Sequence, residues 1–516
     1  MESGSMAAPP PAVAAGLGSA PGDKGLKTGA LGFVQNVVIG VASTAPGYSL
    51  AASLGLVVGV AGIGLQAPAI LLAAFVPMLF IAASYYYMNR ADPDCGTTFS
   101  WVTKAMGPYA GWIGGWAIIV ADIIVMANLA QIAGLYSFRL FDWQSAADST
   151  AAVTAVGIVW IAIMTAICVY GIELSARTQV GLLGAELITL AIFAVVALVK
   201  VAAGDAGPDS VDPSLSWINP FAVDSTSAFV DGVLLSVFIY WGWDSTVTVN
   251  EESENSSETP GRAAVVSTVI LLATYVIVAV AAQAFNGPQD LVDHSDDIFS
   301  ELGTAVLGSP LDKLLIIAVL TSAAASTQTT ILPTARTSLS MARARAMPES
   351  LGRIHPRFLT PHVSTILMGT LSIVWYVGLT IVSENILFDS IAALGLMIAF
   401  YYGLTGFACV VYYRRELLNS ARNFVMIGVL PALGGLMLLG ILVKASIDLS
   451  DPANSESGDS WLGLGPPLVI GIGSMLLGVL LMLWWRATGH REFFKRRPEV
   501  VSMAELSAAP ASGPEA

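Results

Sequence analysis

The sequence is dominated by apolar windows of about 20 residues that recur twelve times along the chain. An α-helix needs about that length to cross roughly 30 Å of hydrocarbon at about 1.5 Å per residue. The chain is therefore predicted to be an all-α integral membrane protein with about twelve transmembrane helices. The windows lie at residues 31–56, 66–88, 110–137, 151–171, 178–202, 229–249, 263–285, 312–335, 363–383, 389–413, 424–445 and 463–485.

The composition excludes other classes of protein. Only 12% of the 516 residues are charged, against about 25% in a soluble domain, and these charges cluster between the apolar windows. Cys95 lies in a short loop, whereas Cys168 and Cys409 lie inside windows, so the cysteines cannot form the disulfide framework of a secreted scaffold. The net charge of −14 argues against a nucleic-acid-binding protein, which would show a basic stripe.

The distribution of basic residues predicts the orientation. Twelve spans place both termini on one side, and a cytoplasmic N-terminus leaves all but four of the 23 Lys and Arg residues inside. We therefore expect a multi-pass protein of the plasma (inner) membrane with cytoplasmic tails at 1–30 and 491–516, both disordered and neither a signal peptide. The acidic runs at 205–212 and 290–297 then face outward, as a solvated surface or as a cation-capturing one. The four outer basic residues are Arg139, Lys200, Lys313 and Lys444.

Two spans are interrupted by residues that disfavour a continuous helix. Residues 43–49 interrupt the first span and residues 240–245 the sixth. Matching interruptions in the leading helices of two halves indicate a substrate site near the bilayer midplane of a secondary transporter. The predicted organisation is a first five-helix repeat at 31–202, an extracellular loop at 203–228, a second repeat at 229–413, and two further helices within 414–490.

The first interruption suits a carboxylate. Pro46 favours the first position of a new helix, and Ser43 or Thr44 could cap it. The N–H groups at the start of this half-helix, together with its dipole, favour an anion. The alternative is a proline kink repaired by neighbouring helices. The residues predicted to line the substrate site here are Thr44, Gly47, Tyr48 and Ser49.

The second interruption suits an amine. Gly242 permits close approach of the backbone, and the carbonyl groups from Ile239 to Gly242 could accept hydrogen bonds from an ammonium group. Tyr240, Trp241 and Trp243 offer flat surfaces for a substrate side chain or its ammonium, or serve only for packing.

Three acidic residues, Asp122, Glu186 and Asp244, lie deep in apolar sequence. A charge at the bilayer centre costs at least about 2.5–3.5 kcal/mol, so such residues are candidates for function. A carboxyl group that loses and regains a proton there would couple transport to H⁺. The alternatives are a neutral carboxyl that bonds a neighbouring helix and, for Glu186, a Na⁺ site completed by Ser326 and Thr327.

The sequence gives no indication of an enzyme, a metal centre or a cofactor. It has no phosphate-binding loop, no HExxH, no CxxC pair and no GxSxG. All four histidines fall in loops or the tail, so they form no ligand cluster.

Two motifs resemble a known family. Residues 340–348 (SMARARAMP), 354–358 (IHPRF) and 360–361 (TP) are similar to the "ARDGxxP … HPRFxTP" pattern of the amino acid, polyamine and organocation (APC) superfamily, with Ala344 and Arg345 replacing Asp-Gly. Residues 238–245, followed by Glu251 and Glu252, are similar to the "GxD/E" break of that superfamily. The resemblance covers about residues 31–490 and is strongest to bacterial amino acid permeases.

This resemblance implies a LeuT-like 5+5 inverted repeat with broken helices 1 and 6, and alternating access to a substrate between them. Asp122 and Asp244 fall where members carry acids, and Glu186 falls where a proton-coupled member carries a sodium-mimicking Lys, so a true cation, H⁺ or Na⁺, could occupy this site. The implied partners are a small-molecule substrate, the coupling ion and membrane lipid. We expect an H⁺-coupled amino acid permease; a polyamine or cationic amine transporter and an amino acid exchanger are the alternatives.

Overall fold

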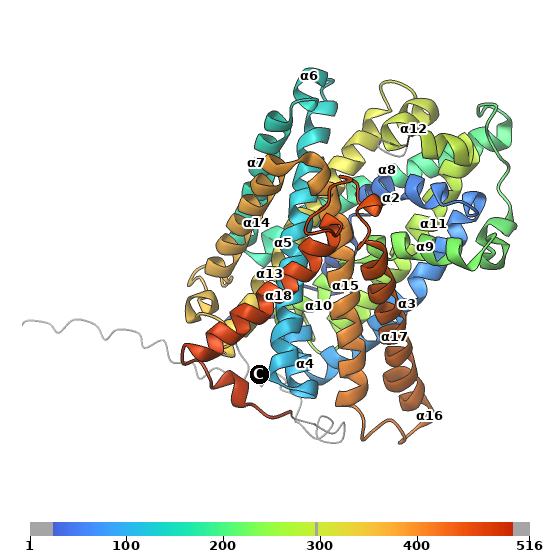
Figure 1. Ribbon diagram of the computed structural model, residues 1–516. Helices are drawn as coiled ribbons and strands as arrows, with labels where there is room; N and C mark the ends of the chain where they lie inside the picture. Colours follow the sequence, from blue (N-terminus) through green and yellow to red (C-terminus); the bar gives the residue numbers. More distant parts are fainter. Residues whose placement is uncertain (1–23, 295–297, 499–516) are drawn as a thin grey trace, which may run out of the picture.

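The computed structural model describes residues 24–294 and 298–498, and all the long elements in these two stretches are helices. These residues contain twelve helical spans, with each broken helix counted as one span, that are long and apolar enough to cross a membrane (Figure 1). The expected all-α fold with twelve transmembrane helices is thereby confirmed. Most of the two tails expected to be disordered lies outside the described residues.

The helices follow the predicted order, with most ends extended by a few residues. The first five spans are α1 (Phe33–Ser43) with α2 (Pro46–Gly59), α3 (Ala67–Ala91), α5 (Pro108–Arg139), α7 (Thr150–Tyr170) and α8 (Ile172–Ala203). The next five are α9 (Thr226–Val237) with α10 (Ser245–Thr248), α11 (Thr259–Asp293), α13 (Lys313–Arg343), α14 (His362–Val382) and α15 (Glu384–Tyr412). The last two are α17 (Leu430–Asp448), preceded by a π-helical turn at Phe424–Val429, and α18 (Pro466–Ala487).

Short helices occupy the connections. The α-helical ones are α4 (Thr98–Met106), α6 (Gln144–Ala147), α12 (Ile298–Leu307) and α16 (Ala421–Asn423). The 3₁₀ turns are η1 (Gly64–Gln66), η2 (Leu215–Ile218), η3 (Pro220–Ala222), η4 (Phe238–Tyr240), η5 (Asn250–Glu252), η6 (Glu349–Gly352), η8 (Pro452–Asn454) and η9 (Phe493–Lys495).

The first span is broken, as the sequence predicts, but its second half is capped differently. Ala45, with a left-handed φ of 48°, is the N-cap of α2, and Pro46 takes the first helical position. Neither of the expected capping side chains serves, because the Thr44 hydroxyl donates to the carbonyl of Val41, 2.6 Å away, and the Ser43 hydroxyl faces Ser245. The start of α2 is therefore left for other helices to satisfy.

The sixth span unwinds for longer. After α9 the chain makes the turn η4, passes through Trp241 and Gly242, and forms only one helical turn, α10, before η5. Gly242 has a φ of +113°, which side-chain-bearing residues rarely adopt. The sixth span can therefore unwind in this way because residue 242 is a glycine.

Helix α13 forms the centre of the bundle and is buried along almost its whole length between α5, α8 and the two broken spans. It presents an unusual number of hydroxyl groups for a buried helix. Several of them donate to carbonyls of α13 itself, so they need no partner outside the helix. The buried hydroxyl residues are Ser322, Ser326, Thr327, Thr329, Thr330, Thr334, Thr337, Ser338 and Ser340.

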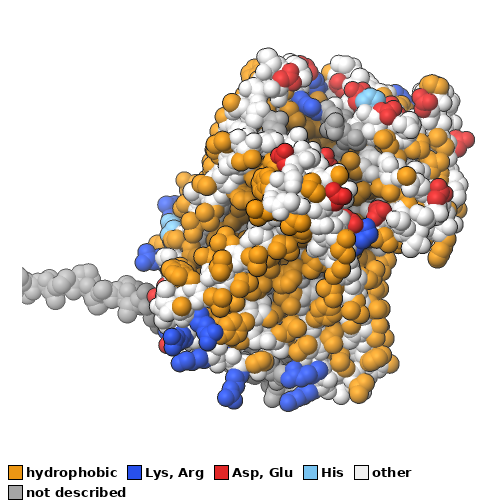
Figure 2. Space-filling view, in the orientation of Figure 1, with side chains coloured by type: hydrophobic (Ala, Val, Ile, Leu, Met, Phe, Trp, Pro, Cys, Tyr) orange, Lys and Arg blue, Asp and Glu red, His pale blue; other side chains and the backbone are white. Residues whose placement is uncertain are grey.

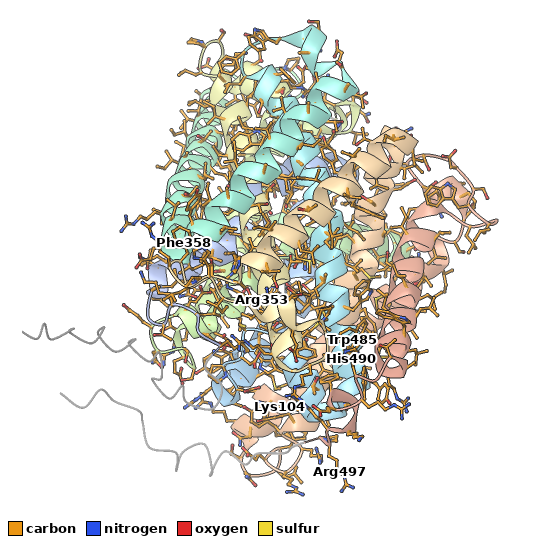
Figure 3. The ribbon with its side chains drawn as sticks, turned by 90° about the vertical axis from the view of Figure 1, so that its left-hand side faces the viewer. Lys104, Arg353, Phe358, Trp485, His490 and Arg497 are labelled. Atoms are coloured by element: carbon orange, nitrogen blue, oxygen red, sulfur yellow. The ribbon has the colours of Figure 1, made fainter. Side chains whose placement is uncertain are left out.

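Charge is distributed unevenly over the outer surface. Apolar side chains form a broad band, with basic side chains at the lower end of the view and acidic ones at the upper end (Figure 2). After a quarter turn, Lys104, Arg353 and Arg497, which are distant in sequence, all lie in the lower half (Figure 3). The band matches the hydrocarbon-facing surface that twelve spans require.

Candidate substrate and coupling site

The two interrupted spans touch each other at their breaks. A Cβ atom added to Gly242 would lie 2.7 Å from the carbonyl oxygen of Ser43, so backbone meets backbone. The hydroxyls of Ser43 and Ser245 are 2.7 Å apart and join the same two segments. The pairing of breaks inferred from the sequence is thus a direct contact in the structure.

The N–H groups at the start of α2 are all occupied by groups of the protein. Gly47 N–H donates to Oε1 of Glu186 over 2.7 Å, and Tyr48 N–H donates to Oγ of Ser322 over 3.2 Å. Ser49 N–H makes the ordinary helical bond to the carbonyl of Ala45. Of the three donors that the sequence assigns to a substrate carboxylate, Gly47 already holds a carboxylate from α8.

Glu186 is fully buried, and its second oxygen, Oε2, has no hydrogen-bond partner in the described part of the chain. The two candidate Na⁺ ligands on α13 are bonded elsewhere. The Ser326 hydroxyl donates to the carbonyl of Ser43, and the Thr327 hydroxyl donates to that of Ala323. Ser322, one turn earlier, is the α13 residue that meets the start of α2.

The unwound stretch of the sixth span offers fewer acceptors than the sequence suggests. The carbonyl of Ile239 accepts the hydroxyl of Tyr275 over 2.5 Å, and the carbonyl of Gly242 accepts the N–H of Ser245 over 3.0 Å. Among the described residues, the carbonyls of Tyr240 and Trp241 accept no hydrogen bond. These two are the acceptors left for an amine.

Asp244 lies among tyrosine hydroxyls. Tyr402 donates to Oδ1 over 2.8 Å, while Tyr401 and Tyr85 donate to Oδ2 over 3.3 and 3.5 Å. The indole N–H of Trp241 donates in turn to the Tyr401 oxygen. The carboxyl group is therefore surrounded by donors and aromatic rings, and no salt bridge to it occurs within the described chain.

The three aromatic residues of the break differ in position. The ring of Trp243 packs between those of Tyr85 and Tyr402, with centroids 5.1 and 5.3 Å away. Tyr240 instead points out of the break, because its hydroxyl donates to the carbonyl of Leu71, 3.1 Å away. Trp241 and Trp243 thus contact the tyrosines that bond Asp244, whereas Tyr240 serves to pack the sixth span against α3.

Asp122 contacts α13 at another level. The hydroxyl of Thr334 lies 2.9 Å from Oδ2 of Asp122 and 2.7 Å from the carbonyl of Thr330. The three acids thus bond different elements: Asp122 meets α13, Asp244 meets α15, and Glu186 meets the start of α2.

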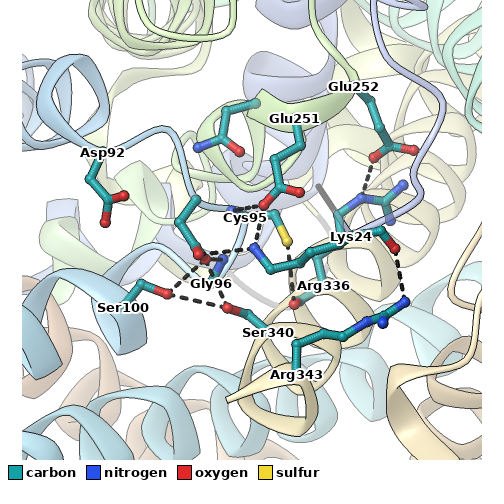
Figure 4. A network of polar contacts seen from close by, with 12 residues as sticks. Lys24, Asp92, Cys95, Gly96, Ser100, Glu251, Glu252, Arg336, Ser340 and Arg343 are labelled. Atoms are coloured by element: carbon teal, nitrogen blue, oxygen red, sulfur yellow. Dashed lines mark hydrogen bonds and ion pairs between the residues drawn. The ribbon is translucent and has the colours of Figure 1, made fainter. Parts of the chain in front are cut away.

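Below the break, the chain preceding α1 is fixed by Lys24 (Figure 4). The Lys24 ammonium lies 2.9 Å from Oδ2 of Asp94 and also bonds Glu251. The other oxygen of Asp94 accepts the hydroxyls of Ser100 and Ser340, over 2.7 and 2.8 Å. We call these five residues the Lys24 network; it joins the N-terminal segment, the α3–α4 loop, η5 and α13.

The electrostatics of the Lys24 network are those of a tight ion pair. Burial tends to lower the pKa of the Lys24 ammonium, but the carboxylates of Asp94 and Glu251 outweigh it and raise this pKa well above its ordinary value. Burial tends to raise the pKa of Asp94, but Lys24, the Ser100 hydroxyl and the Gly96 N–H hold it below its ordinary range. Both groups are charged at neutral pH.

A second ion pair lies beside it, between Arg336 and Glu252 at 2.6 Å, with both side chains buried. Asp94, Cys95 and Glu251 bring three possible metal ligands within 4.8 Å of one another. The Lys24 ammonium group already bonds both carboxylates, so it takes the place that a metal ion would have in this cluster.

Sequence reasoning missed the groups that surround the candidate residues. Tyr85, Tyr401, Tyr402 and Ser322 come from spans far along the chain, and their side chains resemble ordinary packing residues in apolar sequence. Spacing within one helix predicts no contact between α3, α13 and α15. The adjacent Tyr401 and Tyr402 were the only available signal, because two neighbouring phenols inside a membrane span each need a polar partner.

Comparison with known proteins identifies the family. The profile of the amino acid permease family matches residues 30–474, which include both breaks and all three buried acids. The chain belongs to this family. The match includes the whole of α17 and ends inside α18, after the first turns of that helix.

The curated relatives are transporters with different cargoes. An uncharacterized transporter of Mycobacterium tuberculosis is 29% identical over 66% of this chain and 71% of its own length. The branched-chain amino acid permease BcaP of Lactococcus lactis is 26% identical over 42% of this chain and 48% of its own. The low-affinity putrescine importer PlaP of Escherichia coli is 20% identical over 72% and 79%. The chain is a multi-pass membrane transporter that takes a small molecule; its cargo does not follow from these relatives.

Proposed function

We propose that the chain is a secondary active permease that moves an amino acid across the plasma membrane together with H⁺ by alternating access. The observation that carries this proposal is the contact between the two breaks at Ser43 and Gly242, with buried acids on both sides of it. Both breaks offer ends of interrupted helices, which suit the two charges of an amino acid. The orientation proposed has both termini in the cytoplasm.

The proposed roles follow the geometry of each group. The substrate carboxylate binds at Gly47 and Tyr48, and the ammonium group binds the carbonyls of Tyr240 and Trp241. Trp241 and Trp243 form the walls. Asp122, Glu186 and Asp244 exchange the coupling proton, because each is buried without a basic partner among the described residues.

The direct test is uptake into proteoliposomes that contain the purified chain. Radiolabelled amino acids are supplied with an imposed inward H⁺ gradient, an inward Na⁺ gradient, or an inside-negative potential. We expect uptake of a zwitterionic amino acid above its external concentration with the H⁺ gradient alone. One net charge moved per cycle adds about 2.3 kcal/mol per 100 mV, or about a fiftyfold gradient, so the potential should increase accumulation. Accumulation driven by Na⁺ alone would instead support a Na⁺ site at Glu186, Ser326 and Thr327.

A specific observation favours a second candidate, a carrier of cationic amines. The start of α2 already holds the Glu186 carboxylate, and Asp244 sits in a ring of tyrosine and tryptophan side chains, which suits an ammonium group. In that case Asp244→Asn should abolish binding of putrescine. If Asp244→Asn still binds putrescine and loses only its pH dependence, the amine-binding role is rejected. Uptake that occurs only into amino-acid-loaded vesicles would indicate an exchanger.

A further inference from the structure

The start of α2 is an anion site that the protein itself fills. Pro46 has no N–H, so the first donor of the helix is Gly47, and it bonds the Glu186 carboxylate from α8. A Cβ atom on Gly47 would lie 3.4 Å from Oε1 of Glu186 and 3.5 Å from the carbonyl oxygen of Ala318, so α8 and α13 both lie in contact distance of this position. The second donor, Tyr48 N–H, is held by Ser322.

An ionised Glu186 has no side chain that balances its charge among the described residues. Helices α1 and α7, which pack against α8, carry no Lys, Arg, Asp, Glu or His. On α13 the nearest basic residues, Lys313 and Arg336, are more than two turns from Ser322, and on α12 Glu301 is exposed. The titratable group that faces Glu186 from α11 is Tyr275, whose hydroxyl bonds the carbonyl of Ile239. The helix terminus is thus the sole positive partner of Glu186 among the described residues.

We propose that Glu186 is a tethered competitor for the substrate carboxylate, so that a carboxylate-bearing substrate enters this site only together with a proton on Glu186. The inference rests on the function proposed above and adds the step that couples cargo to H⁺. Two ionised carboxylates cannot share one dry helix terminus, because each disfavours the charged form of the other. A proton on Glu186 removes that repulsion.

The exchange conserves both atoms and charge. One proton from the water on the entry side forms an O–H bond on Glu186, and the Gly47 N–H turns from Oε1 to an oxygen of the incoming carboxylate. The site gains one H⁺ and one carboxylate, so its net charge does not change. On the exit side the carboxylate leaves, the proton returns to water, and Glu186 bonds Gly47 again. The cycle therefore carries one proton for each carboxylate.

The test compares wild-type protein with Glu186→Gln, which mimics protonated Glu186. Purified full-length protein is titrated with each of the twenty proteinogenic L-amino acids between pH 5.5 and 8.5, with binding followed by thermal shift. We expect the wild-type affinity to fall by up to tenfold per pH unit as Glu186 ionises, and Glu186→Gln to bind with little pH dependence. Glu301→Gln, which makes the same change at an exposed position of α12, should behave as wild type.

A measurement on the wild-type protein alone gives a second readout. In weakly buffered solution with a pH indicator, binding of an amino acid should take up about one proton, whereas the amine left by its decarboxylation should take up none. Unchanged pH dependence in Glu186→Gln, or no proton uptake by wild type, would overturn the inference and leave the permease function standing. Binding of diamines but of no amino acid, by either protein, would reject amino acid cargo and this competition with it.

Discussion

At the scale of single residues, the contact between the breaks depends on one missing side chain. Gly242 has a φ of +113°. A Cβ atom on Gly242 would also lie only 2.7 Å from the carbonyl oxygen of Ser43. We expect Gly242→Ala to force the two breaks apart, which should lower the free energy of unfolding by at least about 1–3 kcal/mol and abolish uptake in proteoliposomes. The apparent Tm and the uptake rate measure these two effects.

The matched control is another glycine-to-alanine change. Gly378 lies on the exposed face of α14, has no positive φ, and has open space where its Cβ would be. Gly378→Ala should leave uptake unchanged and raise the unfolding free energy by up to about 1 kcal/mol, because alanine suits a helix better than glycine does. Equal loss of uptake in both variants would contradict the role given to Gly242.

Which residues the sequence revealed depends on how local their chemistry is. Pro46 and Gly242 were visible because proline and glycine control their own backbone, and Glu186 and Asp244 because acids in apolar sequence are costly. The partners of these acids were not predictable, since Ser322 and Tyr402 meet them only through the packing of distant spans. The capping of α2 was assigned to the wrong residues for the same reason: neighbours in sequence turned elsewhere, and α8 supplied the acceptor.

At the scale of elements, the Lys24 network ties the segment before α1 to η5 and α13. We expect a path from the break to this face to open only when these contacts part. Cys95 is a native reporter, because it is fully buried in the network and its Sγ faces the carbonyl of Arg336. We expect Lys24→Met to increase the rate of maleimide labelling of Cys95 by about tenfold or more.

The pKa of the Cys95 thiol allows opening to be distinguished from a change in the reactivity of the thiol. Burial and the nearby Glu251 carboxylate raise the pKa of the Cys95 thiol, and Lys24 lowers it. Removal of Lys24 should therefore make this thiol less reactive, so faster labelling would report opening. Lys27→Met is the control, since Lys27 pairs with Glu173 while both are roughly half exposed. Faster labelling in the Lys27 variant as well would show that the effect is not specific to the network.

The stability of the Lys24 network has a definite pH window. The pKa of Asp94 is held below its ordinary value, so its contribution is present above about pH 4 and is lost as the pH falls through the folded-state value. The pKa of Lys24 is raised, so its contribution persists up to about pH 10 and is lost above that. The difference in apparent Tm between wild type and Lys24→Met should accordingly disappear at low pH, where the carboxylates are neutral.

At the scale of the whole molecule, charge asymmetry defines two different ends. Basic side chains gather at the lower end in Figure 2 and acidic ones at the upper end, which the positive-inside tendency relates to cytoplasm and exterior. We expect an impermeant maleimide to label Ser216→Cys in intact cells, and to label Ser350→Cys only after the cells are permeabilised. Both positions are exposed, and the three native cysteines are buried, so they give little background. The reverse pattern would invert the proposed orientation.

The number of spans and the position of the breaks were predictable at this scale because a bilayer imposes both the length of a span and the internal pairing of its backbone. The contacts that make α13 the centre of the bundle were not predictable from the sequence. Its hydroxyl residues reduce its apolar character, so by sequence it looks like one of the less hydrophobic spans, while in the structure it touches α1, α2, α5, α7, α8 and α14.

The position of Thr334 relates the shape of α13 to the protonation state of Asp122 on α5. A hydroxyl group has a single hydrogen, yet both Asp122 and the carbonyl of Thr330 lie within its reach. An ionised Asp122 accepts the hydrogen of the Thr334 hydroxyl. A protonated Asp122 instead donates its own hydrogen to Thr334, and the Thr334 hydrogen then turns to the carbonyl of Thr330. Such a bond to a carbonyl one turn back bends helices. We therefore expect protonation of Asp122 on α5 to change the curvature of α13, which packs against α1, α2, α5, α7, α8 and α14.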